Sequence, residues 1–449
     1  MNILNSVLAI LIMFIPLYPK FPLFNVQNTY VAIRLDDIIV AISVLIWFIY
    51  QIKHKFPIFK EKITWFIIAY LLAIFLSTLN ALLIFQTVPK NILALHFIRR
   101  IEYISLFFLT ITTLKNKKDL KIFYFFFVVT ALLVSAYGFG QKYFHLPVVS
   151  TMNSEFSKGQ LLEMNVWTRI SATFAGHYDL AAYMTIVLII IGGVLITTKN
   201  KFLKFVSLLI WFVCFQILNL TASRISTFAF WGGMTITIIL LKRYLWIIPL
   251  SILMILSIVN SKDLNQRLLA TIPSFKSQIK TIKKAPTPTP SPIPVVSTAP
   301  IPTPKVVAVK VIPTPTVFRH TPIEEFPSVD IDAGVARSGE IRFNTEWPRA
   351  ITAFKKNILL GTGLGSITLA TDNDFLRLLG ESGLLGFFTF MSILVFFVIK
   401  TFKKPSSLAY IFLGALMATL ANSLFIDVFE ASKFAYTFWI MMGIYYFIL

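Results

Sequence analysis

The sequence has few of the residues on which metal sites and disulfide-stabilised folds depend. Its 449 residues include one cysteine and five histidines, and only 14% of them are charged. The single cysteine, Cys214, excludes an internal disulfide and any metal site built from several thiolates. The histidines are scattered, without HExxH or paired spacing, so a zinc site is not expected. Neither a metal nor another cofactor is predicted.

The shortage of charge accompanies an excess of apolar residues. Hydrophobic residues make up 57% of the chain, 44 residues are Phe, and the mean hydropathy is +0.77. Soluble domains are usually about 45–50% apolar and about 25% charged. So few charges cannot cover an aqueous surface, which excludes a soluble enzyme and indicates an integral membrane protein.

Long apolar segments predict an all-α polytopic membrane protein. A spanning helix needs about 20 predominantly apolar residues, and twelve segments meet this requirement. The first lacks the basic region and the cleavage site of a signal peptide, so we expect it to remain as a helix. The predicted spans are 3–19, 35–52, 63–86, 92–113, 120–140, 178–198, 203–220, 224–241, 244–260, 376–399, 407–424 and 432–449.

Lysines predict the orientation of these helices. They are concentrated in the loops that follow the second, fourth, sixth, eighth and tenth spans. Cytoplasmic loops carry an excess of Lys and Arg, so this side is predicted to be cytoplasmic, with both termini on it. The net charge of +21 therefore needs no nucleic-acid partner. We expect a multi-pass protein of the plasma (inner) membrane, surrounded by membrane lipids.

Arginine is distributed differently from lysine. Only Arg243 lies in a predicted cytoplasmic loop, and the other arginines lie on or near the outer side. A guanidinium binds phosphate or carboxylate through two parallel hydrogen bonds. Two interpretations stay open: these arginines pair with outer acidic residues, or they form an anion site at the outer interface.

Two outer segments are long, about 141–177 and about 261–375. The second contains a Pro-rich stretch, 286–327, with 12 of the 22 prolines. Proline-rich chains form extended spacers rather than packed structure. The predicted organisation is a membrane domain, 1–260, an external loop with a Pro-rich tether, and a second membrane part, 376–449, with the last three helices.

Ionisable residues within predicted spans are candidate functional residues. Arg99 and Glu102 are neighbours on one helical face, and Arg100 lies beside them. One structural ion pair accounts for one arginine only, so at least one of the two is a candidate for binding substrate. At the start of the second span, Arg34 and Asp36–Asp37 favour a helix-end ion pair and cap.

Two shorter outer segments combine arginine with small polar residues. Arg224 follows Ser223 in a turn at a helix start, where free backbone N–H groups favour an anion; the alternative is contact with lipid headgroups. Arg169 and His177 precede the sixth span. His177 is a candidate proton carrier, and an interfacial histidine without that role is the alternative.

The richest region spans 340–383. Arg342 and Arg349 flank Trp347, and the glycines of 361–365 predict a flexible turn, because no strand–turn–helix unit for a dinucleotide surrounds them.

A charged stripe follows that turn. Asp374, Arg377 and Glu381 share one helical face, which predicts a polar cavity at the outer end of the tenth span. The ligand spacing of an EF-hand calcium loop is absent.

Together these segments resemble the O-antigen ligase and O-antigen polymerase family of bacterial envelope membrane proteins. The resemblance covers about 200–390, with weaker support from Arg169 to Tyr178, and rests on the order, sidedness and loop length of the matches. The matching residues are Ser223–Arg224, Arg342 with Trp347, Gly361 to Gly365, Asn373 with Leu376, and Glu381 with Gly383. This chain has Asp372 where many relatives have a histidine that helps the acceptor hydroxyl attack.

The resemblance implies an enzyme that transfers a glycan from a polyprenyl-diphosphate carrier to a hydroxyl of a glycan or lipid-glycan acceptor. The reaction would take place at the outer membrane face, towards the periplasm or cell exterior, and arginines would stabilise the diphosphate leaving group without metal. The candidates for the diphosphate are Arg224, Arg342, Arg349, Arg99, Arg100 and Arg169. The candidates for accepting the proton are Asp372, Asp374, His177 and Glu381.

Two other classes remain open. Twelve helices with both termini inside also suit a secondary transporter of an anionic or lipid-linked substrate. The halves of the chain show no repeat, however, and the long loop follows the ninth span rather than the middle. A scaffold protein would leave the arginines within the spans unexplained. Ligase and polymerase activities are not separated by any motif.

Overall fold

The computed structural model describes residues 3–25, 32–86, 88–149, 161–162, 169–260, 341–367 and 370–449. The predicted Pro-rich tether, 286–327, lies outside the described residues, as does the rest of 261–340.

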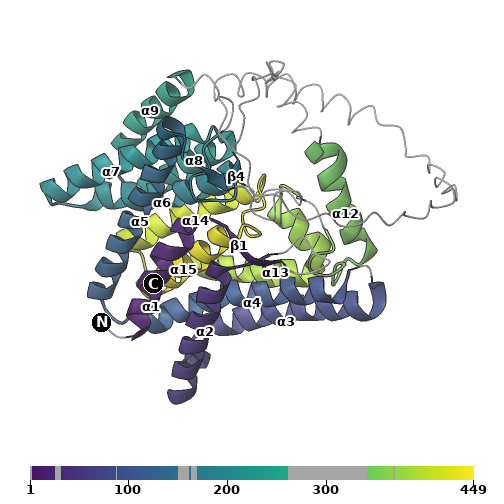
Figure 1. Cartoon of the computed structure of the whole chain (residues 1–449). Coiled ribbons are helices and arrows are strands. Elements are labelled where there is room, and N and C mark those ends of the chain that lie inside the picture. The colour runs from purple at the N-terminus through teal and green to yellow at the C-terminus, as the bar shows by residue number, and fades with distance from the viewer. Residues whose placement is uncertain are drawn as a thin grey trace, which may run out of the picture.

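Helices dominate the described residues (Figure 1). The α-helices are α1 (Ile3–Leu17), α2 (Leu35–Lys53), α3 (Lys62–Asn80), α4 (Lys90–Thr113), α5 (Lys117–Phe144), α6 (His177–Thr197), α7 (Lys201–Leu220), α8 (Arg224–Leu240), α9 (Ile247–Asn260), α12 (Trp347–Lys356), α13 (Asp374–Lys403), α14 (Ser407–Ser423) and α15 (Ser432–Ile448). Short 3₁₀ or π turns are η1 (Pro57–Lys60), η2 (Ala81–Phe85), η3 (Tyr244–Trp246) and η4 (Arg342–Glu346). Two small antiparallel pairs join β1 (Pro22–Asn25) to β2 (Ala32–Arg34) and β3 (Val148–Val149) to β4 (Leu161–Leu162).

Each of the twelve apolar segments predicted from the sequence contains an α-helix. Six helices of the described residues are long and apolar enough to cross a membrane: α2, α3 extended by η2, α5, α6, α7 and α13. Four further apolar helices, α1, α8, α9 with η3, and α14, are shorter. An all-α fold with several candidate membrane spans is confirmed, whereas the number of twelve spans and their sidedness stay predictions.

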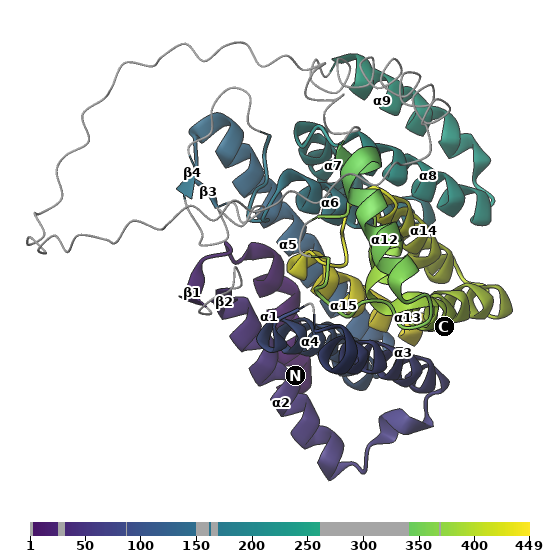
Figure 2. The same cartoon turned by 90° about the vertical axis from the view of Figure 1, so that its right-hand side faces the viewer.

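Helix α6 lies at the centre of the bundle, where α7, α8 and α14 pack on it (Figures 1 and 2). In its most apolar window 89% of the residues are buried, whereas the corresponding value for α2 is 28%. Outer helices expose large apolar side chains such as Phe48, Phe125 and Phe202. A helix that is apolar all round belongs in the interior or in lipid, and α6 occupies the interior.

Glycines allow α8 and α14 to approach each other backbone to backbone. A Cβ atom on Gly233 would lie 2.6 Å from the carbonyl oxygen of Gly414, and one on Gly414 would lie 1.9 Å from Thr237 Oγ1. Small residues at such crossings are characteristic of helix packing in membranes, because van der Waals contact between the helices replaces the hydrophobic effect.

Helix α13 is broken at Gly383, where φ is +63°. The backbone of the glycine-containing segment pairs with this break: the N–H of Leu384 donates to Ile358 (2.8 Å) and that of Gly363 donates to Glu381 (2.9 Å). Gly361 also has a positive φ, and a Cβ there would lie 2.5 Å from the Glu381 backbone. The predicted turn is present at Leu364–Gly365, these glycines allow the segment to pack tightly against α13, and its flexibility stays a prediction.

Lys433, near the start of α15, ties three distant segments together. Its buried Nζ donates to the carbonyl oxygens of Pro16 (3.1 Å) and Thr173 (2.6 Å), and it lies 5.0 Å from the Phe174 ring. The end of α1, the segment before α6 and the start of α15 therefore meet at one end of the bundle.

Candidate functional site

The segment before α6 is held by a buried side chain, Gln141 of α5. Its amide donates to the carbonyl oxygen of Ala172 (2.9 Å) and accepts from the N–H of the same residue (2.8 Å). Ala172 has a φ of +47°, a conformation that needs such support. Gln141 thereby positions the segment that carries Arg169 and leads into α6.

Arg169 and His177 contact each other directly, with 2.6 Å between Arg169 Nη1 and His177 Nε2. A guanidinium can only donate hydrogen bonds, so Nε2 of His177 accepts and carries no proton. The Arg169 guanidinium also lies 6.0 Å from the centre of the Tyr178 ring. As a result, the Nε2 lone pair that would serve a proton carrier is already occupied.

Arg342 in η4 holds Asp372 across the fold. Arg342 Nε and Nη2 lie 2.8 Å and 2.7 Å from Asp372 Oδ2. Asp372 has a φ of +50°, which an aspartate tolerates better than most residues. Burial raises the pKa of the Asp372 carboxyl, and the adjacent Arg342 offsets only part of this rise.

Arg224 joins the same group from a third segment. Ser223 caps α8, its side chain accepting from the N–H of Ser226, so Arg224 begins the helix. It lies close enough to Tyr178, Arg342 and Arg169 for electrostatic interaction with each of them. The structure therefore brings together three predicted arginines, from the segment before α6, the start of α8 and η4.

Glu346, which the sequence analysis did not single out, lies beside this group. Burial and then the neighbouring Asp372 raise the pKa of its carboxyl to about 7, against the opposing effect of Arg342. Its Oε2 is buried and has no hydrogen-bond partner among the described residues. The sequence did contain a signal for Glu346, which follows Arg342 by four residues and precedes Arg349 by three. On a helix this spacing places the three side chains near one face.

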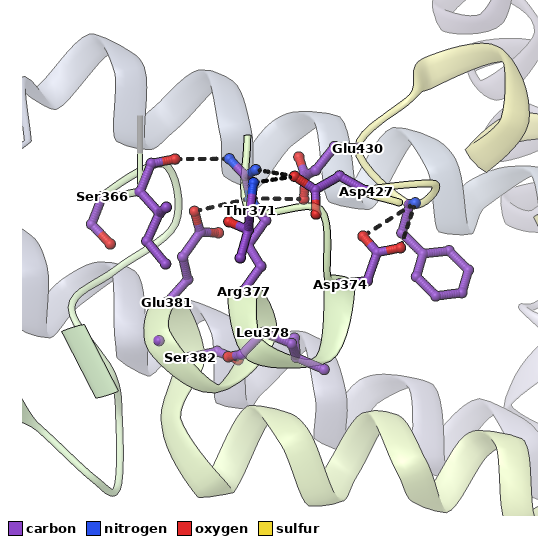
Figure 3. Close-up of polar contacts among 12 residues, drawn as sticks. Ser366, Thr371, Asp374, Arg377, Leu378, Glu381, Ser382, Asp427 and Glu430 are labelled. Atoms are coloured by element: carbon purple, nitrogen blue, oxygen red, sulfur yellow. Dashed lines mark hydrogen bonds and ion pairs between the residues drawn. The ribbon is translucent and has the colours of Figure 1, made fainter. Parts of the chain in front are cut away.

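The predicted charged stripe of α13 does face polar groups, but they belong to the protein itself (Figure 3). Arg377 lies 3.0 Å from Asp427 and 3.4 Å from Glu381, and it donates to the carbonyl oxygen of Ile367 (2.8 Å). Both Asp374 oxygens accept from the N–H of Phe429, at 3.2 and 3.3 Å. This network ties α13 to the loop between α14 and α15.

Arg100 belongs to the same network, pairing with the Glu430 carboxylate and donating to the carbonyl oxygen of Phe429 (3.0 Å). The cavity that Arg100, Asp374, Arg377 and Glu381 line has a volume of about 30 Å³. That is room for roughly two water molecules. The roles of Arg100, Asp374 and Glu381 in binding or proton transfer stay predictions.

Arg99 lies in a second, half-buried network, in contact with Asp37 at 3.5 Å. Asp37 also accepts from the backbone N–H of Arg34 (3.0 Å), which gives the helix cap expected at α2. Nearby, burial and then Arg34 lower the pKa of Lys20 to about 8. Both arginines of α4 thus have carboxylate partners in the fold, and binding of substrate by either stays a prediction.

Within the described parts of the chain, no three His, Cys, Asp or Glu side chains gather in a way that could hold a metal ion. No protein-family model matches the chain, and no curated protein matches it.

Proposed function

We propose that the protein is a membrane glycosyltransferase that moves a glycan from a polyprenyl-diphosphate carrier to an acceptor hydroxyl on the outer face of the plasma membrane. The observation that carries this proposal is the convergence of Arg169, Arg224 and Arg342 from three separate segments. Bringing three guanidinium groups together costs electrostatic energy, which a bound anion recovers.

A diphosphate suits this group better than a carboxylate does. It presents several oxygens and gains negative charge as the glycosidic bond breaks, so preorganised guanidiniums stabilise the transition state. The exposed apolar side chains of the surrounding helices, such as Phe228 of α8, suit the lipid tail of such a donor. Neither a ligase-like nor a polymerase-like acceptor is favoured by these contacts.

Lysine substitutions test the proposal. Arg224→Lys and Arg342→Lys keep the charge but lose the planar fork. Each should lower transfer at least about tenfold, equivalent to about 1.4 kcal/mol of transition-state stabilisation. Consumption of the polyprenyl-linked glycan fraction extracted from native membranes is the readout. Arg243→Lys, in the loop between α8 and η3, is the matched control. Full transfer by both site variants would reject this site.

A secondary transporter of an anionic or lipid-linked substrate is the second candidate function. The observation that favours it is the buried network around Lys433 and Asp36, whose two carboxylate oxygens have no hydrogen-bond partner among the described residues. Buried ionisable groups are frequent in transport pathways. Accumulation of intact lipid-linked glycan on one face of proteoliposomes, without consumption, would favour this function.

A further inference from the structure

Four buried polar atoms around the start of α12 have no hydrogen-bond partner among the described residues. They are Glu346 Oε2, Trp347 Nε1, Arg349 Nη1 and Thr371 Oγ1. Buried polar groups are nearly always paired, because leaving them unpaired costs free energy. A hydroxylated ligand suits groups of these kinds, one acceptor, two N–H donors and one hydroxyl, since each of its hydroxyls both donates and accepts.

The indole of this group is held in place by other rings. Trp347 packs edge-on against Phe343, with 4.7 Å between ring centres, and lies 6.3 Å from Phe425. An aromatic side chain fixed in this way keeps its Nε1–H direction without further cost when a ligand binds. The Trp347 indole is therefore preorganised for a ligand.

Asp372 is poorly suited to accept a proton in this arrangement. Its Oδ2 already receives two guanidinium N–H groups from Arg342, at 2.7 and 2.8 Å. These hydrogen bonds occupy Oδ2 and favour its charged form, which offsets part of the rise in the pKa of Asp372 that burial causes. Glu346 differs, because its Oε2 accepts no hydrogen bond within the described part of the chain.

The surroundings of Glu346 also make it a stronger base. The charged groups that act on it are Asp372, Arg342, Asp427 and Arg349. Burial and the two aspartates raise the pKa of its carboxyl, the two arginines lower it, and the result is about 7. A general base is most effective when its pKa is near the working pH.

We propose that Glu346, Trp347 and Arg349 form the subsite for the acceptor hydroxyl, and that Glu346 Oε2 takes the proton from that hydroxyl. This inference rests on the proposed glycosyl transfer and specifies its second substrate.

The acceptor oxygen forms a bond with the anomeric carbon while its proton passes to Glu346. The bond from that carbon to the phosphate oxygen breaks, and its electron pair leaves with the polyprenyl diphosphate. Asp372 then serves to position Arg342.

The test compares Glu346→Gln and Glu346→Asp with the wild type. Transfer from the native polyprenyl-linked glycan fraction is measured over about pH 5 to 9. Wild-type transfer should rise through a midpoint near pH 7, the pKa of Glu346. Glu346→Gln should lower the transfer rate by about 100-fold or more and remove its rise with pH. Glu346→Asp, which keeps a carboxylate, should retain part of the rate and part of the pH dependence. Glu61→Gln, an exposed carboxylate between η1 and α3, is the matched control.

A second measurement separates chemistry from folding. Glu346→Gln should bind polyprenyl diphosphate, assayed by co-purification, as the wild type does. Loss of this binding would show that Glu346 is structural and would overturn the base assignment. Transfer by Glu346→Gln within about threefold of the wild type would overturn this inference while leaving the proposed function standing. A wild type that never consumes the donor would overturn both.

Discussion

Arg377 Nη1 lies 3.0 Å from Asp427 Oδ2, and this contact joins the start of α13 to the loop between α14 and α15. Asp427 also accepts from the backbone N–H groups of Thr371 (2.7 Å) and Asn373 (3.0 Å). One carboxylate therefore holds both residues that flank Asp372. The conformation of the candidate site depends on a side chain that does not itself belong to the three-arginine group.

Asp427→Asn should accordingly destabilise the protein. Removing one charge of a buried ion pair leaves Arg377 with incomplete compensation, at a cost of about 3 kcal/mol. The expected result is a clear decrease in the thermal unfolding temperature of the protein in detergent. Glu61→Gln makes the same chemical change at an exposed position. Equal unfolding temperatures for the two variants would show that Asp427 is not a structural anchor.

Gly383→Ala should prevent correct folding of α13. The residue has a φ of +63°, and an added Cβ would lie 2.4 Å from the Leu359 carbonyl. Both the strain and the clash oppose the break that pairs with the glycine-containing segment. Fluorescence-detected size exclusion should show loss of the monodisperse peak. Gly232→Ala is the control, because nothing lies within 4 Å of its added Cβ; a normal peak for both variants would contradict the prediction.

Asp372→Asn distinguishes the two candidate bases. Asp372 raises the pKa of Glu346, so removing its charge should lower that pKa. A rate that rises through the Glu346 pKa should then reach its midpoint at a lower pH than in the wild type. If Asp372 were the base, transfer would instead be lost at every pH. The pH profile of donor consumption in isolated membranes is the measurement.

The predicted topology can be tested with single cysteines after Cys214→Ser. A cysteine at Ser338 should react with a membrane-impermeant thiol reagent in intact cells, because the loop that contains it is predicted to be external. A cysteine at Lys117, in a predicted cytoplasmic loop, should react only after permeabilisation. The reverse pattern would invert the orientation.

The helices were predictable because a chain in lipid must satisfy every backbone polar group within the helix itself. Apolar length therefore located the helices of the twelve predicted segments, but not α12. Arg169 and Arg224 were also identified singly, from their position before or at predicted helix starts, and Arg342 from its place beside Trp347 in the region 340–383. Their convergence was not predictable, since it depends on how helices distant in sequence pack.

The predictions about α13 show that helical periodicity does not predict tertiary contacts. Spacing placed Arg377 and Glu381 on one face but gave no information on what covers that face. Asp427 and Glu430, in a short loop without a motif, pair with Arg377 on that face. Glu346 was missed for a related reason: its raised pKa comes from burial and from Asp372, and neither is visible in the local sequence.

The contact of Lys433 has a consequence for biosynthesis. Helices leave the ribosome in chain order, so Pro16 and Thr173 are made long before the ammonium that binds their carbonyl oxygens. Until α15 is synthesised, the segment that carries Arg169 lacks this support. The arginine group therefore lacks one of its supports until α15 has been made, and a nascent chain arrested before this point would carry the proposed anion site without the contact of Lys433.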